Sequence, residues 1–160
     1  MRSLMHRPNF KQRGVAAVEF ALVLPIIVVL LAFTIFFGRY FWHYNVALKA
    51  AHDAAITLAF AHKTEIGISK PDLSEIEIAK VARAVALAEI AELRPGEGIP
   101  PQVFVNCDNY QCSGDKVPGE VSVMVRMRMV DVNFTAYTGG TVGPDPIWLY
   151  AEVRVPYVGL

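Results

Sequence analysis

The stretch that decides the fold is "RGVAAVEFALVLPIIVVLLAFTIFFGR", residues 13–39. From Val15 to Phe37 the chain runs for 23 residues with a single charged side chain, that of Glu19. As an α-helix, 23 residues extend about 35 Å, which is enough to cross a hydrocarbon core about 30 Å thick. We therefore predict a transmembrane helix over residues 15–38.

A cleaved secretory signal is the main alternative for this stretch. The apolar region of such a signal is only about 7–15 residues long, which is shorter than the run seen here. The sequence "AFA" at residues 59–61 resembles a signal-peptidase site, but it lies far beyond the end of the apolar run. A membrane span that is retained in the protein is therefore the better interpretation.

The charges on either side of the span predict its orientation. The residues before it carry no acidic side chain and four basic ones, which are Arg2, Arg7, Lys11 and Arg13. Because positive charge beside a span favours the cytoplasmic side, the N-terminus is expected inside the cell. The asymmetry is moderate, since Arg39 and Lys49 follow the span. Without residues 1–14 the chain keeps 11 basic and 15 acidic residues and has no Lys/Arg cluster, which argues against a nucleic-acid partner.

Glu19 is the unusual residue of the span, because an ionised carboxylate at a bilayer centre costs about 2.5–3.5 kcal/mol for the comparable Asp. One interpretation is that Glu19 lies near the membrane edge, reaches the headgroups and gains from the positive end of the helix. The other requires a cut between Gly14 and Val15, which would create an α-amine with a pKa of about 7.7–8.0. Glu19 could then face this amine on a neighbouring helix, offsetting the burial of both charges.

The local sequence carries a family resemblance. "RGVAAVEFALVLP" resembles the processing site of a type IV prepilin, with a basic leader, a glycine before the cut and a glutamate at position five of the product. The pair Glu19–Phe20 and the later "FFGRYFWHYNVALKAAHDAA" are similar to the TadE-like minor pseudopilins of tight-adherence (Tad) pilus systems. The resemblance covers about residues 13–60. It departs at "TIFF", residues 34–37, where relatives often carry an acidic residue before Gly38-Arg39.

The resemblance implies that residues 1–14 form a leader cut after Gly14 by a prepilin peptidase, and that Glu19 and Phe20 act in subunit pairing. It implies a minor pseudopilin that helps to assemble a Tad-type, type IVb-like pilus and has no enzymatic activity. The expected partners are membrane lipid, the prepilin peptidase, other pilin and pseudopilin subunits and the Tad assembly platform. The expected location is the bacterial inner membrane, with residues 39–160 in the periplasm and incorporation into a surface pilus as a further expectation. The alternative is an uncleaved single-span protein whose outer domain binds another envelope component.

Pro25 interrupts the hydrogen bonding of the span. Proline has no N–H, so the carbonyl of Ala21 loses its partner and the helix is expected to kink or loosen. Such a kink is tolerated in membrane helices and can be neutral. The resemblance to pilins adds a second interpretation, a local unwinding when subunits leave the bilayer for a filament.

The helix is expected to continue outside the membrane, because residues 39–63 contain neither Pro nor Gly. Its aromatic start, "RYFWHY", suits the membrane interface, and Lys49 and Asp53 stand at ion-pair spacing. Small and apolar residues recur at three- and four-residue steps, which predicts a packed face. This stripe comprises Tyr40, Tyr44, Ala47, Ala51, Ala54, Ala55 and Leu58.

Beyond this helix the pattern predicts a small α+β domain. Asp72 and Glu75 have capping-box spacing, and a second helix is expected over residues 73–93. The apolar period then changes to two, in a short strand at Val103 and Val105, in "EVSVMVRMRM" and in "IWLYAEVRV". We predict an α+β fold in which a long N-terminal transmembrane helix continues into an outer, pilin-like domain. In that domain the second helix packs on an antiparallel sheet of three or four strands.

Cys107 and Cys112 are the two cysteines of the chain. Outside the cytoplasm, a lone pair of cysteines favours one disulfide, here closing a small loop. Two thiols are too few for a structural zinc site. No paired carboxylates stand near a histidine and no phosphate-binding glycine loop is present, so the residues indicate no catalytic residue and no cofactor. His43, His52 and His62 stand nine and ten residues apart, so consecutive ones fall on opposite faces of the helix and cannot share a metal ion, and no metal site is expected.

Overall fold

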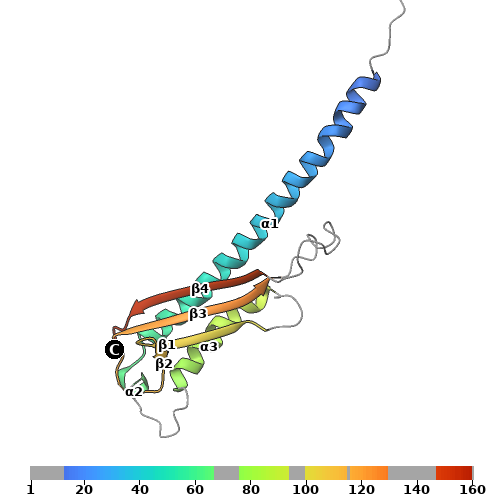
Figure 1. Ribbon diagram of the computed structural model, residues 1–160. Coiled ribbons are helices and arrows are strands. Elements are labelled where there is room, and N and C mark those ends of the chain that lie inside the picture. Colours follow the sequence, from blue (N-terminus) through green and yellow to red (C-terminus); the bar gives the residue numbers. More distant parts are fainter. Residues whose placement is uncertain (1–12, 67–75, 94–99, 115, 130–146, 160) are drawn as a thin grey trace, which may run out of the picture. The chain divides into compact units, whose positions relative to one another are not determined.

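The computed structural model describes residues 13–66, 76–93, 100–114, 116–129 and 147–159. The elements follow in the order α1 (Arg13–Ala59), α2 (Lys63–Ile66), α3 (Glu77–Ile90), a 3₁₀ turn (Ala91–Leu93), β1 (Gln102–Cys107), β2 (Tyr110–Gln111), β3 (Glu120–Met129) and β4 (Ile147–Pro156) (Figure 1). The chain divides into two compact units, Met1–Phe37 and Gly38–Leu160, which we describe in turn. A long apolar helix followed by a small antiparallel sheet and a shorter helix confirms the α+β prediction.

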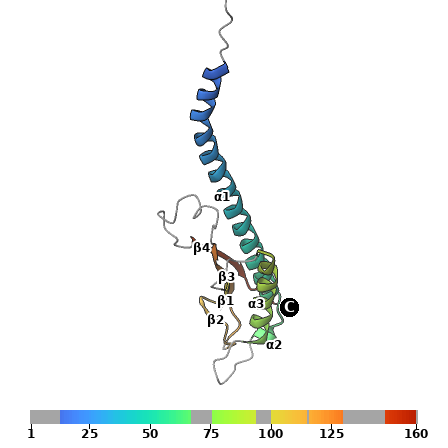
Figure 2. The same ribbon diagram turned by 90° about the vertical axis from the view of Figure 1, so that its right-hand side faces the viewer.

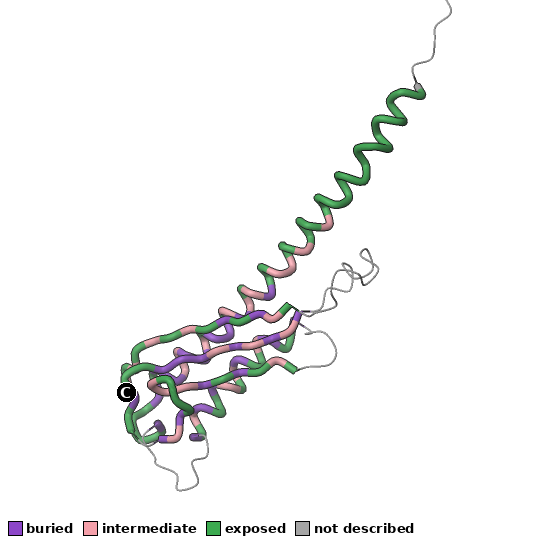
Figure 3. Tube along the Cα trace, in the orientation of Figure 1, coloured by how far each residue is buried: buried purple, intermediate pink, exposed green. Residues whose placement is uncertain are grey.

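The first unit contains the apolar part of α1. Its side chains are exposed all around the helix (Figure 3), with Leu22 70% and Phe20 62% exposed. So much exposed apolar surface is unfavourable in water and suits a hydrocarbon environment. Within the described residues, α1 is the one helix long and apolar enough to cross a membrane. This agrees with a single-span membrane protein.

In the second unit, α1 from Gly38 to Ala59 and α3 share one hydrophobic core with the sheet. The predicted stripe is confirmed from Ala47 onward, because its alanines and Leu58 are all inaccessible to solvent and Tyr40 and Tyr44 pack against them. Residues without bulky side chains let helices and sheet approach closely, so the alanines define how near α1 lies to its neighbours. On α3 the same spacing recurs in the buried residues Ala79, Ala82, Ala86 and Ile90.

The end of α1 is closed by the C-terminal segment of the chain. The backbone N–H groups of Val158 and Gly159 both donate to the carbonyl of Ala59, at 3.1 Å each. The Tyr157 hydroxyl donates to the carbonyl of Ala61 at 2.7 Å, and burial raises the pKa of this hydroxyl. Carbonyls at a helix end have no partner within the helix, so these bonds satisfy part of that demand.

The four strands lie in the order β2-β1-β3-β4 and all pair antiparallel. Val105, Val123 and Val153 lie across from one another on neighbouring strands, with their side chains on the face toward the core. Along β3 the core-facing residues Val121, Val123, Val125, Met127 and Met129 are buried, as predicted (Figure 3). Arg126 and Arg128 lie between them on the opposite face.

The predicted start of the second helix is wrong. Ile76 has extended backbone angles, φ −66° and ψ 152°, and its N–H donates to the carbonyl of Cys112 at 3.3 Å. The helix therefore begins at Glu77 because Ile76 is held by the cysteine loop and buries its side chain in the core. The predicted capping residues Asp72 and Glu75 lie outside the described residues.

Candidate functional site: the start of helix α1 and the disulfide hairpin

The predicted cleavage position lies at the beginning of α1. Gly14 and Val15 belong to its first turn, and a methyl group added at Gly14 would meet no atom within 4 Å. Packing within the described chain therefore does not require glycine at this position. Helical backbone does not require it either, and glycine lowers helix stability by about 0.5–1 kcal/mol relative to alanine.

Glu19 and Phe20 follow one turn later on the same helix. Both side chains are exposed, and no ion pair joins Glu19 to another described residue. Residues four apart lie on the same face of a helix, so Glu19 lies about one turn beyond Val15 on that face. The described residues thus supply no ion-pair partner for this charge.

Pro25 lies inside α1, and the helix continues past it to Ala59 without a break. Proline removes one backbone donor at this point, as the sequence requires. The kink and the unwinding expected at Pro25 stay predictions.

The disulfide between Cys107 and Cys112 is present, as predicted, and joins Cα atoms 4.9 Å apart. It spans the tight turn between β1 and β2, where Cys107 pairs with Tyr110. Asp108 and Asn109 form this turn with positive φ values of 49° and 68°. Asp and Asn tolerate this conformation better than other residues with side chains, which explains their place at the centre of the hairpin.

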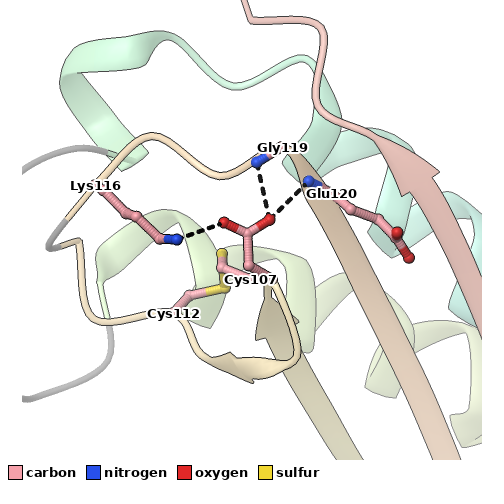
Figure 4. Close-up of a disulfide and its surroundings, with 6 residues drawn as sticks. Cys107, Cys112, Lys116, Gly119 and Glu120 are labelled. Carbon is pink, nitrogen blue, oxygen red and sulfur yellow. Dashed lines mark hydrogen bonds and ion pairs between the residues drawn. A yellow bond between two sulfur atoms is a disulfide. The ribbon is translucent and has the colours of Figure 1, made fainter.

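Asp108 fastens the hairpin to the start of β3 (Figure 4). Its Oδ1 atom accepts hydrogen bonds from the backbone N–H groups of Gly119, at 2.9 Å, and Glu120, at 3.1 Å. Its Oδ2 atom lies 3.2 Å from the Lys116 ammonium. The pKa of the Asp108 carboxyl lies below its usual value. The main cause is the hydrogen bond from the backbone N–H of Glu120, and the second is the hydrogen bond from the Lys116 ammonium.

A second contact ties the same hairpin to β4. The Arg154 guanidinium donates to the Asn109 side-chain oxygen at 3.0 Å and forms an ion pair of 2.8 Å with Glu152. The hairpin is thus held by a covalent bridge, by Asp108 and by Asn109. Sequence reasoning found the bridge and missed the two polar contacts. The Asp-Asn pair directly after a cysteine was a usable turn signal.

Lys49 links α1 to α3 within the second unit. It lies 3.2 Å from Asp53, which confirms the predicted pair, and also forms an ion pair with Glu89 of α3. The hydrogen bond that Lys49 donates to Glu89, and secondly the one that it donates to Asp53, raise the pKa of Lys49. The contact with Glu89 could not be read from sequence spacing, because the two residues lie 40 positions apart.

The histidines and carboxylates are dispersed over the described part of the chain. His43 contacts the carbonyl of Arg39 at 2.8 Å, His52 contacts Asp53 at 3.4 Å and His62 contacts Thr64 at 2.7 Å. Each histidine thus has a local contact on its own segment. In the described residues no three His, Cys, Asp or Glu side chains gather in a way that could hold a metal ion.

Comparison with known proteins adds one finding. No curated protein and no solved structure matches the chain. Residues 14–55 match the model of a protein family described as TadE-like, which confirms the resemblance seen in the sequence. The match begins at the predicted cleavage glycine and ends within the buried alanine stripe of α1. The chain is thus similar to the TadE-like family over the segment from Gly14 to Ala55.

Proposed function

We propose that this protein is a minor pseudopilin that takes part in the assembly of a Tad-type pilus. The observation that carries the proposal is the TadE-like match over residues 14–55, which contains both Gly14 and Glu19. In this role the protein is a structural subunit of the inner membrane and works through its helix contacts. Its partners are a prepilin peptidase, other pilin and pseudopilin subunits and the assembly platform.

Cleavage after Gly14 is the first step of the proposed function. The absence of any close neighbour around Gly14 supports a requirement imposed by an enzyme, because no contact among the described residues needs the small residue. A peptidase that accepts only a glycine before the cut would impose this requirement. The product would begin at Val15 and lose all four basic residues of the leader.

Pairing of Glu19 with the new terminus is the second step. The Val15 α-amine and the Glu19 carboxylate are of opposite charge and lie one helical turn apart along the same face of α1. On two adjacent subunits they can therefore meet if the helices are shifted by about one turn, 5.4 Å. The pair would fix the axial register of the subunits, and Phe20 would pack beside it.

The proposed topology places the N-terminus in the cytoplasm and residues 39–160 in the periplasm. The basic leader supports this orientation. The disulfide between Cys107 and Cys112 also supports it, because disulfides persist in the oxidising periplasm and are rare in the cytoplasm.

The intact mass and N-terminal sequence of the protein recovered from native membranes test the proposal. We expect a chain that begins at Val15, and Gly14→Leu should leave a precursor that begins at Met1. Gly38→Leu is the matched control, because Gly38 is also a helical glycine with no atom within 4 Å of the added methyl group. This variant should be cleaved normally. A wild-type chain that starts at Met1, or close to His62, would contradict the proposal and favour an uncleaved or signal-processed protein.

A further inference from the structure

The face of the sheet that points away from the helices carries an arginine–aromatic patch. It consists of Arg126 and Arg128 on β3 and of Trp148 and Tyr150 on β4. In the strand register Arg126 lies opposite Tyr150, and Arg128 lies opposite Trp148. The Arg126 guanidinium stacks on the Trp148 ring, 4.1 Å from its centre, and lies 5.6 Å from the centre of the Tyr150 ring.

The positive charge of this patch is not balanced within the described residues. No ion pair joins Arg126 or Arg128 to a described carboxylate, and the Nε atoms of both are buried without a hydrogen-bond partner there. Glu152, the nearest acid along β4, is instead engaged by Arg154 at 2.8 Å. Buried donors without a partner are rare in proteins, so the two side chains are not satisfied by the described residues. An anion at the surface would be met by the terminal N–H groups of the guanidinium groups, since the Nε atoms are covered. Stacking covers the face of the Arg126 guanidinium and leaves N–H groups at its edge for such an anion.

The position of the patch indicates where this anion comes from. The ends of β4 and α1 are tied together by the bonds from Val158 and Gly159 to Ala59, and β4 runs alongside α1 in the same direction (Figures 1 and 2). Both lengths are measured from these hydrogen bonds toward the start of each element. The ten residues of β4 extend about 33 Å, and α1 from Ala59 to Gly38 extends about 32 Å. Trp148 and Arg128 therefore lie near the level of the first turns after Gly38.

The first helical turns after Gly38 carry the kind of residue that is common at a membrane–water interface. Phe41 and Trp42 are 58% and 55% exposed, and they lie four and five residues after Phe37, where the apolar segment ends. Exposed aromatic side chains gather at the level of lipid headgroups, and the patch adds Trp148 and Tyr150 at about the same level. Within the second unit, the level of Phe41 and Trp42 thus also carries two further aromatic rings and two arginines that have no ion-pair partner among the described residues.

We propose that the arginine–aromatic patch binds the phosphate groups of anionic phospholipids at the outer surface of the membrane that α1 spans. Arg126 and Arg128 contact the lipid phosphates, and Trp148 and Tyr150 settle among the headgroups. The contact fixes the sheet edge of the outer domain against the membrane. The proposal rests on the membrane span and is independent of cleavage and of pilus assembly.

The test uses the full chain with Trp42→Phe, so that Trp148 is the single tryptophan. The protein is placed in nanodiscs of neutral phosphatidylcholine, or of phosphatidylcholine with phosphatidylglycerol, and quenching of Trp148 by acrylamide is measured. We expect anionic lipid to shield Trp148. One arginine beside an anionic surface raises the equilibrium constant for docking on that surface about fivefold. The two arginines of the patch should therefore raise this constant roughly 25-fold in the anionic nanodiscs relative to the neutral ones. Molar salt should remove the shielding, because the screening length falls to about 3 Å.

Three variants separate the patch from the general charge of the domain. Arg126→Gln with Arg128→Gln should abolish the difference between the two kinds of nanodisc, whereas Arg126→Lys with Arg128→Lys should keep most of it. Lys63→Gln with Lys80→Gln removes the same charge from exposed positions outside the patch and should behave like the unmodified chain. A Gly14→Leu background should give the same results, which separates this test from that of the proposed function.

Candidate ligands other than lipid are tested by adding them to the protein in neutral nanodiscs and measuring the shielding of Trp148. If inorganic phosphate shields Trp148 there as well as phosphatidylglycerol does, the site binds free phosphate and the lipid proposal is overturned. Equal shielding by an added polyglutamate peptide would assign the patch to an acidic protein. Equal quenching of Trp148 in both kinds of nanodisc, or shielding that survives in the glutamine variant, would also overturn it.

Discussion

Asp108 accepts a hydrogen bond from the backbone N–H of Gly119, and the two residues join the tip of the disulfide hairpin to the start of β3, 11 positions later. This hydrogen bond closes a second, noncovalent loop that overlaps the disulfide loop between Cys107 and Cys112. The neighbouring N–H of Glu120 and the ammonium of Lys116 are held by the same carboxylate. One ionised side chain thus joins this hairpin to the start of β3, in addition to the disulfide and the contact of Asn109.

Asp108→Asn should make the stability of the outer domain less dependent on acid. The pKa of Asp108 is lowered in the folded protein, so its contribution is present above the ordinary aspartate pKa of about 3.9 and is lost as the pH falls through the lower folded value. The melting temperature of the wild type should therefore exceed that of the variant at neutral pH, and the two should converge below about pH 3.

Lys116→Gln separates the ion pair of Asp108 with Lys116 from the hydrogen bonds that Asp108 accepts from the backbone. It removes an exposed ion pair, which contributes little, and leaves the backbone bonds from Gly119 and Glu120 in place. Its melting temperature at neutral pH should fall by less than that of Asp108→Asn. If Lys116→Gln has the larger effect, the ion pair rather than the backbone bonds fastens the hairpin.

Loss of the disulfide should weaken the outer domain without unfolding it. Closing a loop of six residues contributes about 2 kcal/mol by the chain-entropy estimate, and the hairpin keeps the contacts of Asp108 and Asn109. Replacing both cysteines with serine should lower the free energy of unfolding by about that amount, measured by denaturant titration. Hydrogen exchange should rise at residues 107–112 and stay low in β3.

The native state of the same cysteines is a separate prediction. Protein taken from the native envelope without reductant should resist alkylation at both Cys107 and Cys112, because both sulfurs are in the bridge. Labelling of either cysteine under these conditions, detected by mass spectrometry, would place the hairpin in a reducing compartment and contradict the proposed periplasmic location.

The packing of α3 gives a prediction with an internal control. Ala86 is inaccessible to solvent, whereas Ala88 on the same helix is exposed. Ala86→Leu should lower the free energy of unfolding by about 1–3 kcal/mol, because the well-packed core has no space for the added carbons. Ala88→Leu has the same change in composition and helix propensity and should be nearly neutral. Equal effects in denaturant titrations would show that the α3 interface is not closely packed.

The local sequence predicted the helices and strands well where a single period decides the structure. The apolar run and the alanine stripe of α1 are long and regular, and the alternation in β3 has one face without a polar residue from Val121 to Met129. The start of α3 was missed because the contact between Ile76 and Cys112 overrides a local capping signal. The bonds of Asp108 and Asn109 and the pairing of Lys49 with Glu89 depend on which segments the fold brings together.

Glu19→Gln should separate processing of the precursor from assembly of the pilus. Gln has nearly the size of Glu and can form hydrogen bonds, so the span and the cut after Gly14 should be largely preserved. It carries no charge, however, and leaves the Val15 amine of the neighbouring subunit without its partner. Removing one member of a fully buried pair costs about 3–5 kcal/mol, which is enough to dissociate most subunit contacts.

The Glu19→Gln experiment is measured by intact mass, by crosslinking to pilin partners and by counting surface pili. We expect cleaved protein that accumulates in the membrane while crosslinks and pili decrease. Glu19→Asp should retain part of both, because its carboxylate is kept on a side chain one methylene shorter. Gly14→Leu provides the opposite control, since it blocks the cut while the carboxylate is intact. Normal crosslinks and pili with Gln at position 19 would refute the pairing and leave Glu19 as a helix-end charge that reaches the headgroups.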